Sequence, residues 1–407
     1  MKVLVFAHTP PPHHGQSYMV KLMVDGLGGD CRRLPEAQAP TAIECYHVNS
    51  RFSEDIEDIG ALRMGKGLLI FKYCLEALWC RFRYGTRAFY YVPAPGKRGA
   101  LYRDWLVMLL CRPFFRVMIH HWHAVGLGDW LRTEGFWFER WLTHRLLGRP
   151  SMGVVLGVPS MRDALWFRSE KVKIVQNGIP DPCPEFEEKV QPRRRARLAA
   201  RRALLAGTEL DAAQQELAGS EPQRFRILYL AHCTADKGLF DTLDAVILAN
   251  SYLRSIHSPI LLSLTVAGKF LNSKEEELFK RQYEIPEVAT SMHYAGFVSG
   301  EEKARLLAES DCLCFPTYYA AEGQPVNLIE AMAYGLTIVT TRWRAIPEIL
   351  PADYDGFVTP RRPTELADKL REMITYESSG LRERFIECFT AEKYLAQMVQ
   401  AMWQAAV

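Results

Sequence analysis

Two glutamates, Glu322 and Glu330, stand eight residues apart in the stretch AAEGQPVNLIEAMAYGL. A carboxylate accepts hydrogen bonds only, so it suits a ligand rich in hydroxyls, such as a ribose or another sugar. The spacing predicts a helix over about Pro325 to Tyr334, with one glutamate ahead of it and one inside it. Pro325 suits the first helical position, where no amide donor is needed, and Gly335 suits the residue just past the end.

The start of this helix adds a second kind of binding group. Its first backbone amides have no partner within the helix, and they form a site for anions and hydroxyls. The strand DCLCFPT ends near Thr317, so Glu322 follows the carboxyl end of a strand, where parallel sheets bind ligands. The two glutamates are therefore predicted to contact different parts of one elongated ligand. The alternative is an acid favoured by the helix dipole at 322 and a solvated surface acid at 330.

A second turn, LAHCTADKG, carries a lysine directly before a glycine. Lys237 can place a point charge beside a phosphate from which a bond is breaking. His232, nearer the strand end, can do the same only when it is protonated, which a nearby phosphate favours. The alternative is that Lys237 is an ordinary surface lysine.

Two further turns hold candidate residues. In HTPPPHHGQS, Gln16 and Ser17 can open the next helix towards a phosphate, although no dinucleotide fingerprint is present. In VMIHHWHAVG, His121 and His123 lie two residues apart and so share one face of a strand. A metal site there lacks a third ligand, and core histidines are the other reading.

Length and composition indicate a soluble chain of two domains. The 407 residues exceed one ordinary core, and the hydrophobic and charged shares are 48% and 24%. No run of apolar residues is long enough for a membrane span, and MKVLVFAH reads as a buried strand rather than a signal peptide. The ten cysteines are scattered, which predicts buried free thiols in a reducing, cytoplasmic compartment.

Positive charge gathers between Ala61 and Arg116. This stretch has eleven Lys or Arg against Glu76 and Asp104, a local charge of +9, interleaved with apolar and aromatic residues. Such a composition fits an anionic membrane surface or an anionic substrate. A solvated basic face of ordinary helices is the alternative.

Apolar strands alternate with amphipathic helices through both halves of the chain, which predicts an α/β fold with two doubly wound parallel sheets. Between them, the Ala- and Arg-rich segment 187–221 reads as a linker or an inserted helix. It lacks interleaved aromatics, so we predict no nucleic-acid partner. Four parts are expected: an acceptor-side Rossmann-like domain (1–182), the linker (183–222), a donor-binding domain (223–384) and a last helix that packs back towards the first domain (385–407).

The segment EGQPVNLIEAMAYGLTIVTTRWRAIPEIL resembles the donor-site signature of family 4 retaining glycosyltransferases with the GT-B fold. Two further segments keep the order of that family: HYAGFVSGEEKARLLAESDCLCFPT before this segment and DGFVTP after it. The stretch VQNGIPD resembles the family's turn at the domain junction. The first half of the chain is similar only in strand order. The resemblance implies two Rossmann-like domains that face a central cleft.

The resemblance also implies roles for individual residues. Glu330 is expected to hold the nucleotide ribose, Glu322 the donor sugar, and Lys237 the diphosphate, with His232 at the position of the family's arginine. His123 is expected beside the donor sugar and, with Glu322 and Lys237, is assigned to catalysis. The remaining donor-binding residues are Gly15, Gln16, Phe297, Val298, Gly323, Gln324, Pro325, Val326, Asn327 and Leu328.

The function that follows is a retaining glycosyltransferase that uses a nucleotide-diphosphate sugar and needs no metal or other cofactor, because no Asp-x-Asp pair follows a strand. Its expected acceptor is a lipid-linked saccharide of cell-surface polysaccharide synthesis, met at the inner membrane face. A nucleotide-sugar-binding protein without transferase activity is the alternative. An NAD-dependent dehydrogenase is excluded by the missing Gly-x-Gly-x-x-Gly turn.

Overall fold

The structure is a computed structural model that describes residues 1–11, 15–33, 41–52, 64–209, 211–285, 289–377 and 379–407. Contacts divide the chain into two compact units. Unit 1 comprises Met1–Ile179, Ala320–Gln324 and Phe389–Val407, and unit 2 comprises Pro180–Tyr319 and Pro325–Cys388. The first change of unit falls three residues from the predicted boundary at 182, and the last segment of the chain belongs to unit 1.

Unit 1 is built on a parallel sheet of six strands in the order β2-β1-β3-β4-β5-β6. The strands are β1 (Lys2–Phe6), β2 (Glu44–Val48), β3 (Ala88–Tyr91), β4 (Val117–Trp122), β5 (Met152–Val155) and β6 (Val172–Ile174). Strand order reverses between β1 and β3, which makes the carboxyl ends of these two strands the expected ligand position of this sheet.

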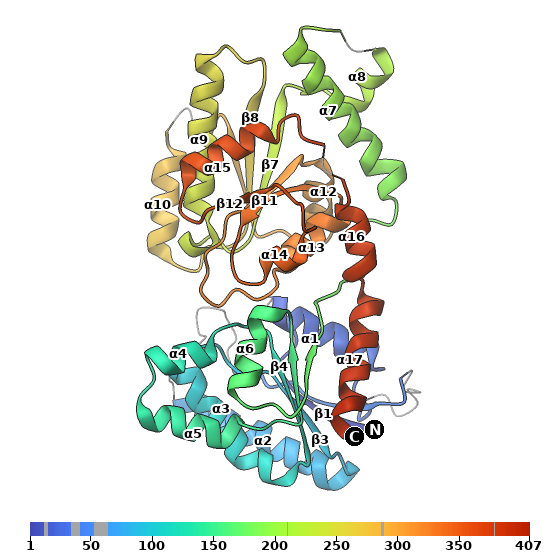
Figure 1. The fold of residues 1–407 in the computed structure, drawn as a ribbon, viewed down its shortest axis with the longest axis vertical. Coiled ribbons are helices and arrows are strands. Elements are labelled where there is room, and N and C mark those ends of the chain that lie inside the picture. The colour runs from blue at the N-terminus through green and yellow to red at the C-terminus, as the bar shows by residue number, and fades with distance from the viewer. Residues whose placement is uncertain (12–14, 34–40, 53–63, 210, 286–288, 378) are drawn as a thin grey trace. The chain divides into compact units, whose positions relative to one another are not determined.

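Helices cover both faces of the unit 1 sheet (Figure 1). One face packs against α2 (Met64–Tyr84), α3 (Arg98–Cys111), α4 (Leu127–Thr133), α5 (Trp137–Leu147) and α6 (Val158–Trp166). The side chains of Leu4, Phe6 and Trp122 are fully buried there. On the other side are α1 (Gly15–Gly26) and α17 (Ala391–Ala406), joined by a hydrogen bond from the Tyr394 hydroxyl to the Met19 carbonyl.

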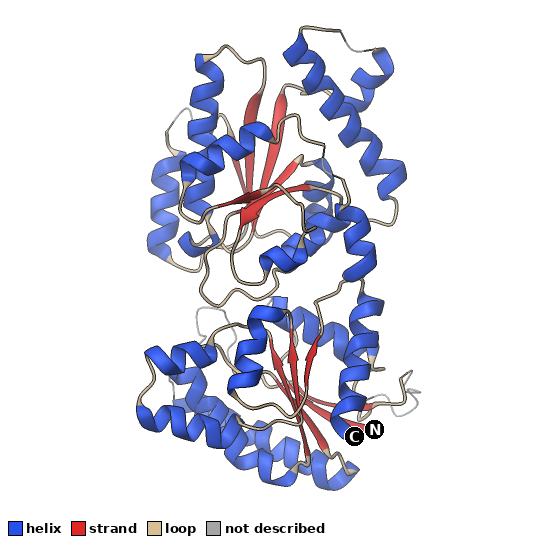
Figure 2. Cartoon of the chain, viewed as in Figure 1, coloured by secondary structure: helices blue, strands red, loops and turns tan. Residues whose placement is uncertain are grey.

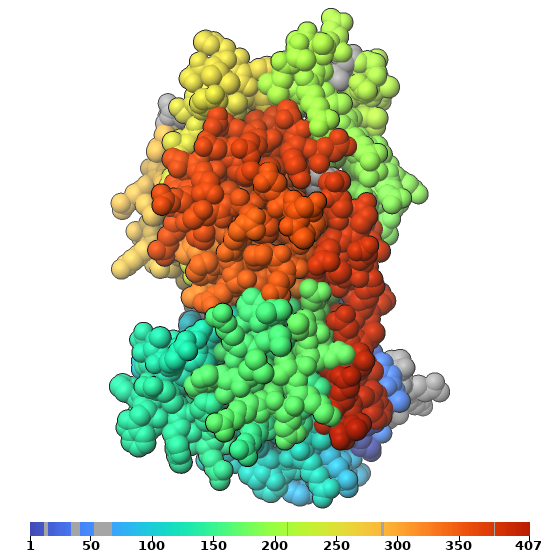
Figure 3. Space-filling view, viewed as in Figure 1, coloured from blue at the N-terminus to red at the C-terminus, as the bar shows by residue number. Residues whose placement is uncertain are grey.

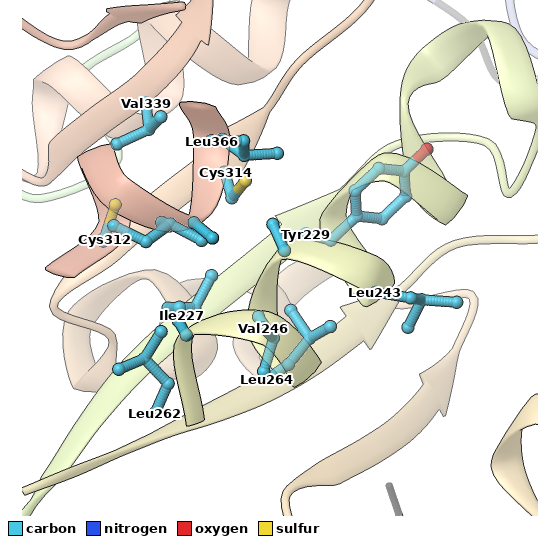
Figure 4. Packing of buried hydrophobic residues seen from close by; sticks show 14 of the residues in the cluster. Ile227, Tyr229, Leu243, Val246, Leu262, Leu264, Cys312, Cys314, Val339 and Leu366 are labelled. Carbon is cyan, nitrogen blue, oxygen red and sulfur yellow. The ribbon is translucent and has the colours of Figure 1, made fainter. Parts of the chain in front are cut away.

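Unit 2 has a second parallel sheet of six strands, in the order β12-β11-β10-β7-β8-β9. The strands are β7 (Arg224–Leu230), β8 (Leu261–Ala267), β9 (Met292–Gly296), β10 (Cys312–Phe315), β11 (Thr337–Thr341) and β12 (Phe357–Val358). The order reverses between β7 and β10. In Figure 4, buried side chains of β7, β8 and β10 pack with Leu243 and Val246 of a covering helix.

The helices of unit 2 alternate with its strands, as Figure 2 shows. They are α9 (Leu239–Ser255), α10 (Ser273–Tyr283), α12 (Gly300–Glu309), α13 (Val326–Ala333), α14 (Ile346–Ile349), α15 (Pro363–Glu372) and α16 (Leu381–Cys388), with short turns η3 (Phe186–Val190) and η4 (Ala235–Lys237). The predicted α/β class with two doubly wound sheets is confirmed.

The Arg-rich segment predicted as a linker or inserted helix contains α7 (Gln191–Ala206) and α8 (Ala212–Ala218), and it belongs to unit 2. Figure 3 shows it as a yellow-green layer on this unit. Arg197 Nε donates to Asp311 Oδ1 at 2.8 Å, and Arg201 Nη1 lies 3.1 Å from Asp311 Oδ2. Burial alone would raise the pKa of Asp311, but Arg201 and Arg197 lower it below its usual value. These two arginines hold the helix to the sheet instead of facing solvent.

Candidate functional site

The turn that carries Lys237 lies at the switch point of the unit 2 sheet. It follows β7, and its Asp236 carbonyl accepts a hydrogen bond of 2.8 Å from the Tyr318 amide in the turn after β10. Gly238 has φ +83° and begins α9, and a Cβ there would lie 2.6 Å from the Pro316 carbonyl oxygen. The glycine after Lys237 is therefore required both by its backbone angle and by the close packing of the two turns.

The ammonium group of Lys237 is held against aromatic rings. Its Nζ lies 4.5 Å from the centre of the Tyr319 ring and 5.7 Å from that of Phe315. Such cation–π contacts favour one position of a flexible lysine. Sequence reasoning missed Tyr319, although the Tyr-Tyr pair just before Glu322 was a visible signal of aromatic side chains at this strand end.

The start of α13 meets the end of β7 at the same place. Asn327 Nδ2 donates to the Leu230 carbonyl at 2.8 Å, which fixes the first turn of α13 beside the Lys237 turn. The helix begins at Val326, one residue later than predicted, and Pro325 is its N-cap residue. A proline has no amide hydrogen to donate. The amides of Val326, Asn327 and Leu328 are the ones left without helical partners.

Glu330 is paired with a lysine that sequence reasoning did not single out. Lys303 Nζ, on α12, lies 2.5 Å from Glu330 Oε1, and the glutamate side chain is 14% exposed. Nothing in the charged sequence GEEKARLL marks Lys303 above its neighbours. Glu330 is thus a held, partly buried carboxylate, and a surface acid fully surrounded by solvent is the wrong description of it.

His232 was predicted to act as a cation only when a nearby phosphate favours its protonation. Burial, followed by the charges of Lys237 and Lys269, lowers its pKa below the usual value. The imidazole is therefore neutral near pH 7 in this structure and adds no positive charge to that of Lys237. Phe297 and Val298 follow the edge strand β9, and Phe297 is exposed.

The loop with the first glutamate packs within unit 1. The Asn177 amide donates to Gln324 Oε1 at 2.5 Å, and Asn177 Nδ2 donates to the Gln324 carbonyl at 3.0 Å. A Cβ on Gly323 would lie 2.1 Å from the His123 carbonyl oxygen. Glu322 itself is buried. The structure therefore brings the backbone of Gly323 next to His123, and the glycine is needed for this close approach of two backbones.

A buried aromatic chain leads to His123. Tyr90 Oη and His121 Nδ1 are 2.7 Å apart, and the His121 and His123 rings have their centres 4.0 Å apart. Burial, followed by the charge of His8, lowers the pKa of His123 to about 3, so this ring is neutral at physiological pH. Its Nε2 is buried without a hydrogen-bond partner in the described part of the chain. A neutral imidazole with an unused nitrogen can bind a hydroxyl.

The other predicted residues of unit 1 start a helix. Gly15 and Gln16 open α1, after β1, and Gly15 is exposed. The turn residues 12–14 lie outside the described residues. Across the described ranges, no three His, Cys, Asp or Glu side chains form a group that could hold a metal ion. The predicted residues thus form two sets, one in each unit, and their individual roles remain predictions.

The chain was compared with known protein families. Residues 213–389, which include the Lys237 turn, β10 and α13, match the model described as "Glycosyl transferases group 1". This segment is a glycosyl transferases group 1 domain. The domain covers most of unit 2 and contains both glutamates of the opening motif. The recognition of a glycosyltransferase from its motifs is confirmed at this level, whereas the narrower assignment to family 4 remains a prediction.

Relatives of this group 1 domain are named as bacterial glycosyltransferases. An MMP alpha-(1->4)-mannosyltransferase of Mycolicibacterium hassiacum is 33% identical over 129 residues, which are 30% of each chain. The amylovoran biosynthesis glycosyltransferase AmsK of Erwinia amylovora is 39% identical over 69 residues, 16% of this chain and 17% of that protein. The chain therefore matches less than a third of the length of either relative.

Solved structures resemble the chain over its whole length. HepE of Anabaena in complex with UDP has a TM-score of 0.62 at 14% identity, and the match covers 99% of this chain and 100% of that one. Sucrose-phosphate synthase of Thermosynechococcus elongatus has a TM-score of 0.66 at 14% identity, with both chains fully covered. At such identities the likeness concerns the fold alone, and it is that of GT-B glycosyltransferases.

Proposed function

We propose that this chain is a glycosyltransferase that moves a sugar from a nucleotide-diphosphate sugar to an acceptor hydroxyl in polysaccharide synthesis. One observation carries the proposal: the Lys237 turn follows β7 and α13 follows β10, and the order of the unit 2 strands reverses between these two strands. A lysine and a helix start at such a point form a site for a diphosphate. The names of the relatives and the UDP and UDP-glucose complexes of HepE support the same ligand class.

The proposed reaction retains configuration at the anomeric carbon and uses no metal. The acceptor oxygen attacks that carbon as its bond to the diphosphate breaks, and the departing phosphate takes the acceptor's proton. Lys237 and the amides of Val326, Asn327 and Leu328 stabilise the charge that builds on the diphosphate. Glu330 holds the ribose and Glu322 the sugar, while neutral His123 contacts a sugar hydroxyl. We assign no covalent nucleophile.

The proposed acceptor is a lipid-linked saccharide reached from the cytoplasmic face of a membrane. The basic and aromatic composition between Ala61 and Arg116 supports this acceptor class. The donor's base, its sugar and the acceptor glycan are to be identified by experiment.

Donor hydrolysis tests the proposal without an acceptor. The purified chain is incubated with a panel of nucleotide sugars, with and without EDTA, and nucleotide release is measured. Release from one donor, unaffected by EDTA and absent in a Lys237→Ala variant, is the expected result. Lys274→Ala, which removes an exposed lysine of α10, is the matched control.

The competing function is nucleotide-sugar binding without transfer. It is favoured by the environment of His232, because burial and the charges of Lys237 and Lys269 lower the pKa of this ring and so oppose the second cation that a diphosphate site would use. Calorimetric binding of a nucleotide sugar with no hydrolysis, and no transfer to any lipid-linked acceptor tried, would establish that function and overturn the proposed one.

A further inference from the structure

One face of unit 1 is unusually apolar for a surface. Among the described residues, twelve large apolar side chains are exposed on or beside α2, α3 and α5, and Leu68 and Trp137 reach 76% exposure. We call this surface the α2–α3–α5 face. Its apolar members are Leu68, Phe71, Leu75, Trp79, Phe82, Leu106, Leu109, Phe114, Phe136, Trp137, Phe138 and Trp141.

Helix α2 explains how the face arises. Its buried side carries Ile70, Cys74, Ala77 and Cys80, which pack on the sheet. Its exposed side carries a second apolar row at positions 68, 71, 75, 79 and 82, with the spacing of three and four that keeps residues on one face of a helix. A helix that is apolar on two sides is expected to be covered on both, and the sheet covers only one.

The three helices make this surface continuous. α3 packs against α2 on one side and against α5 on the other. The rings of Phe82 and Phe114 meet at 5.8 Å, which joins the end of α2 to the turn after α3. At the start of α5, the Phe136 and Phe138 rings stack at 5.8 Å beside Trp137. Exposed contiguous apolar surfaces of this extent mark interaction sites.

Charge distinguishes between the possible occupants. Residues 67–147 contain twelve Lys or Arg and five Asp or Glu, a net charge of +7. Two of the acids, Asp104 and Glu139, are fully buried, and Glu76 is paired with Arg32. Lys72, Arg83, Arg116 and Arg140 are exposed. A second copy of the chain would bring the same positive surface against itself, whereas an anionic surface would be attracted to it.

We propose that the α2–α3–α5 face inserts into the interfacial region of an anionic lipid bilayer. Exposed tryptophans and phenylalanines are suited to the headgroup region, and arginines and lysines beside them contact lipid phosphates. Among the described residues, none of the helices is a candidate for a membrane-spanning segment. The inference names the membrane surface at which the lipid-linked acceptor of the proposed function is met, and rests on that function for the acceptor only.

The groups expected to bind the bilayer differ between the sequence prediction and the structure. The sequence predicted a basic stretch ending at Arg116, and binding through charges such as Arg81. In the structure Arg81 Nε donates to the Phe114 carbonyl at 2.7 Å, so this arginine supports the turn after α3. α5, outside the predicted stretch, supplies Trp137 and Trp141. Arg63, counted in that stretch, lies outside the described residues. Insertion of aromatic side chains therefore adds a contribution that salt does not screen.

The test is flotation of the full chain with vesicles of phosphatidylcholine alone or mixed with phosphatidylglycerol. We expect binding to the mixed vesicles, weakened but not abolished by high salt. The double variant Trp137→Ser/Trp141→Ser should lower the partition coefficient about tenfold or more. The matched control is Leu248→Ser/Leu278→Ser, which removes two exposed leucines of unit 2 and should bind as the wild type does.

Three outcomes would overturn the inference. They are absence of vesicle binding by the wild-type chain, equal binding by the tryptophan variant, and a wild-type dimer in sedimentation that the tryptophan variant loses, which would assign the face to self-association. Donor hydrolysis in solution is measured on the same samples. If hydrolysis is absent but vesicle binding follows the expected pattern, the proposed function fails while the membrane face stands.

Discussion

The polar groups at the carboxyl ends of the strands differ in charge between the two sheets. We call these two places the unit 1 edge and the unit 2 edge. At the unit 2 edge, Lys237 is held against Tyr319, and Asn327 holds the first turn of α13 to the end of β7. At the unit 1 edge, His123 and His121 are buried and neutral, and Gln324 is fixed by hydrogen bonds to Asn177. The first edge suits a ligand group that gains negative charge, and the second suits uncharged hydroxyls.

The largest expected effect comes from removing the cation of the unit 2 edge. Lys237→Ala should lower kcat for donor hydrolysis about 10²–10³-fold, because the charge on the leaving diphosphate loses its nearest side-chain stabiliser. Steady-state kinetics with the donor found in the panel measure this. Lys274→Ala serves as the control, and activity of Lys237→Ala within twofold of it would contradict the comparison.

Next in size is Gly323→Ala at the unit 1 edge. The added Cβ would lie 2.1 Å from the His123 carbonyl oxygen, so the loop that carries Glu322 must move. A displacement of this kind should cost about 10²-fold in donor hydrolysis. Gly67→Ala is the control, since a Cβ there meets nothing within 4 Å. Unchanged kinetics for Gly323→Ala would mean that the position of this loop does not matter for the reaction.

Glu330→Ala tests the second charged side chain of the unit 2 edge, a carboxylate, whereas Lys237 is the cation there. The loss of its hydrogen bonds to a ribose should weaken donor binding by about 1.5–3 kcal/mol, measured by calorimetric titration. Lys303→Ala keeps the carboxylate and removes only its partner at 2.5 Å, so it should weaken donor binding less. Equal donor affinity in Glu330→Ala and the wild type would reduce this pair to a structural contact.

The smallest step, counted per group and per pH unit, comes from the neutral histidines of unit 1. The pKa values of His120 and His123 are lowered from 6.5 to about 3, mainly by burial. At a pH between these two values, both rings bind a proton in the unfolded chain and neither does in the folded chain. The free energy of unfolding should therefore fall as pH drops below 6.5, by about 1.4 kcal/mol per pH unit for each histidine.

Tryptophan fluorescence can follow this effect, because eight of the nine tryptophans belong to unit 1. Urea unfolding at a series of pH values between 7 and 4 gives the slope. The variant His120→Gln removes one of the groups with a lowered pKa and should make the slope shallower. A flat dependence in the wild type would show that these rings are not neutral when folded.

The resemblance of motifs to a known family predicted most of the unit 2 edge. The helix after β10, its glycine terminator and the Lys237–Gly238 turn follow from local rules of proline, glycine and strand order, so they could be anticipated. Two features could not be: the Lys303 partner of Glu330 and the lowered pKa of His232. Each depends on residues far away in sequence or on burial, which no local pattern records.

Unit 1 was less predictable, for the same reason. Spacing placed His121 and His123 on one side of a strand, and their rings do lie together. Three features required the sheet order and the packing of helices to be known: the hydrogen bond between Tyr90 and His121, the contact of Gly323 with His123, and the second apolar row of α2. Hydrophobic pattern alone does not say which of two apolar sides of a helix is left uncovered.

The sequence by itself determined the alternation of strands and helices, the turns that carry chemistry and the family of the second half, because these depend on spacing and on single residues with special backbone properties. Only the tertiary structure decided that residues 320–324 belong with unit 1, that Arg197 and Arg201 are buried on Asp311, and that the pKa of His123 is low. Burial and contacts between distant segments set these features, and both arise only when the chain has folded.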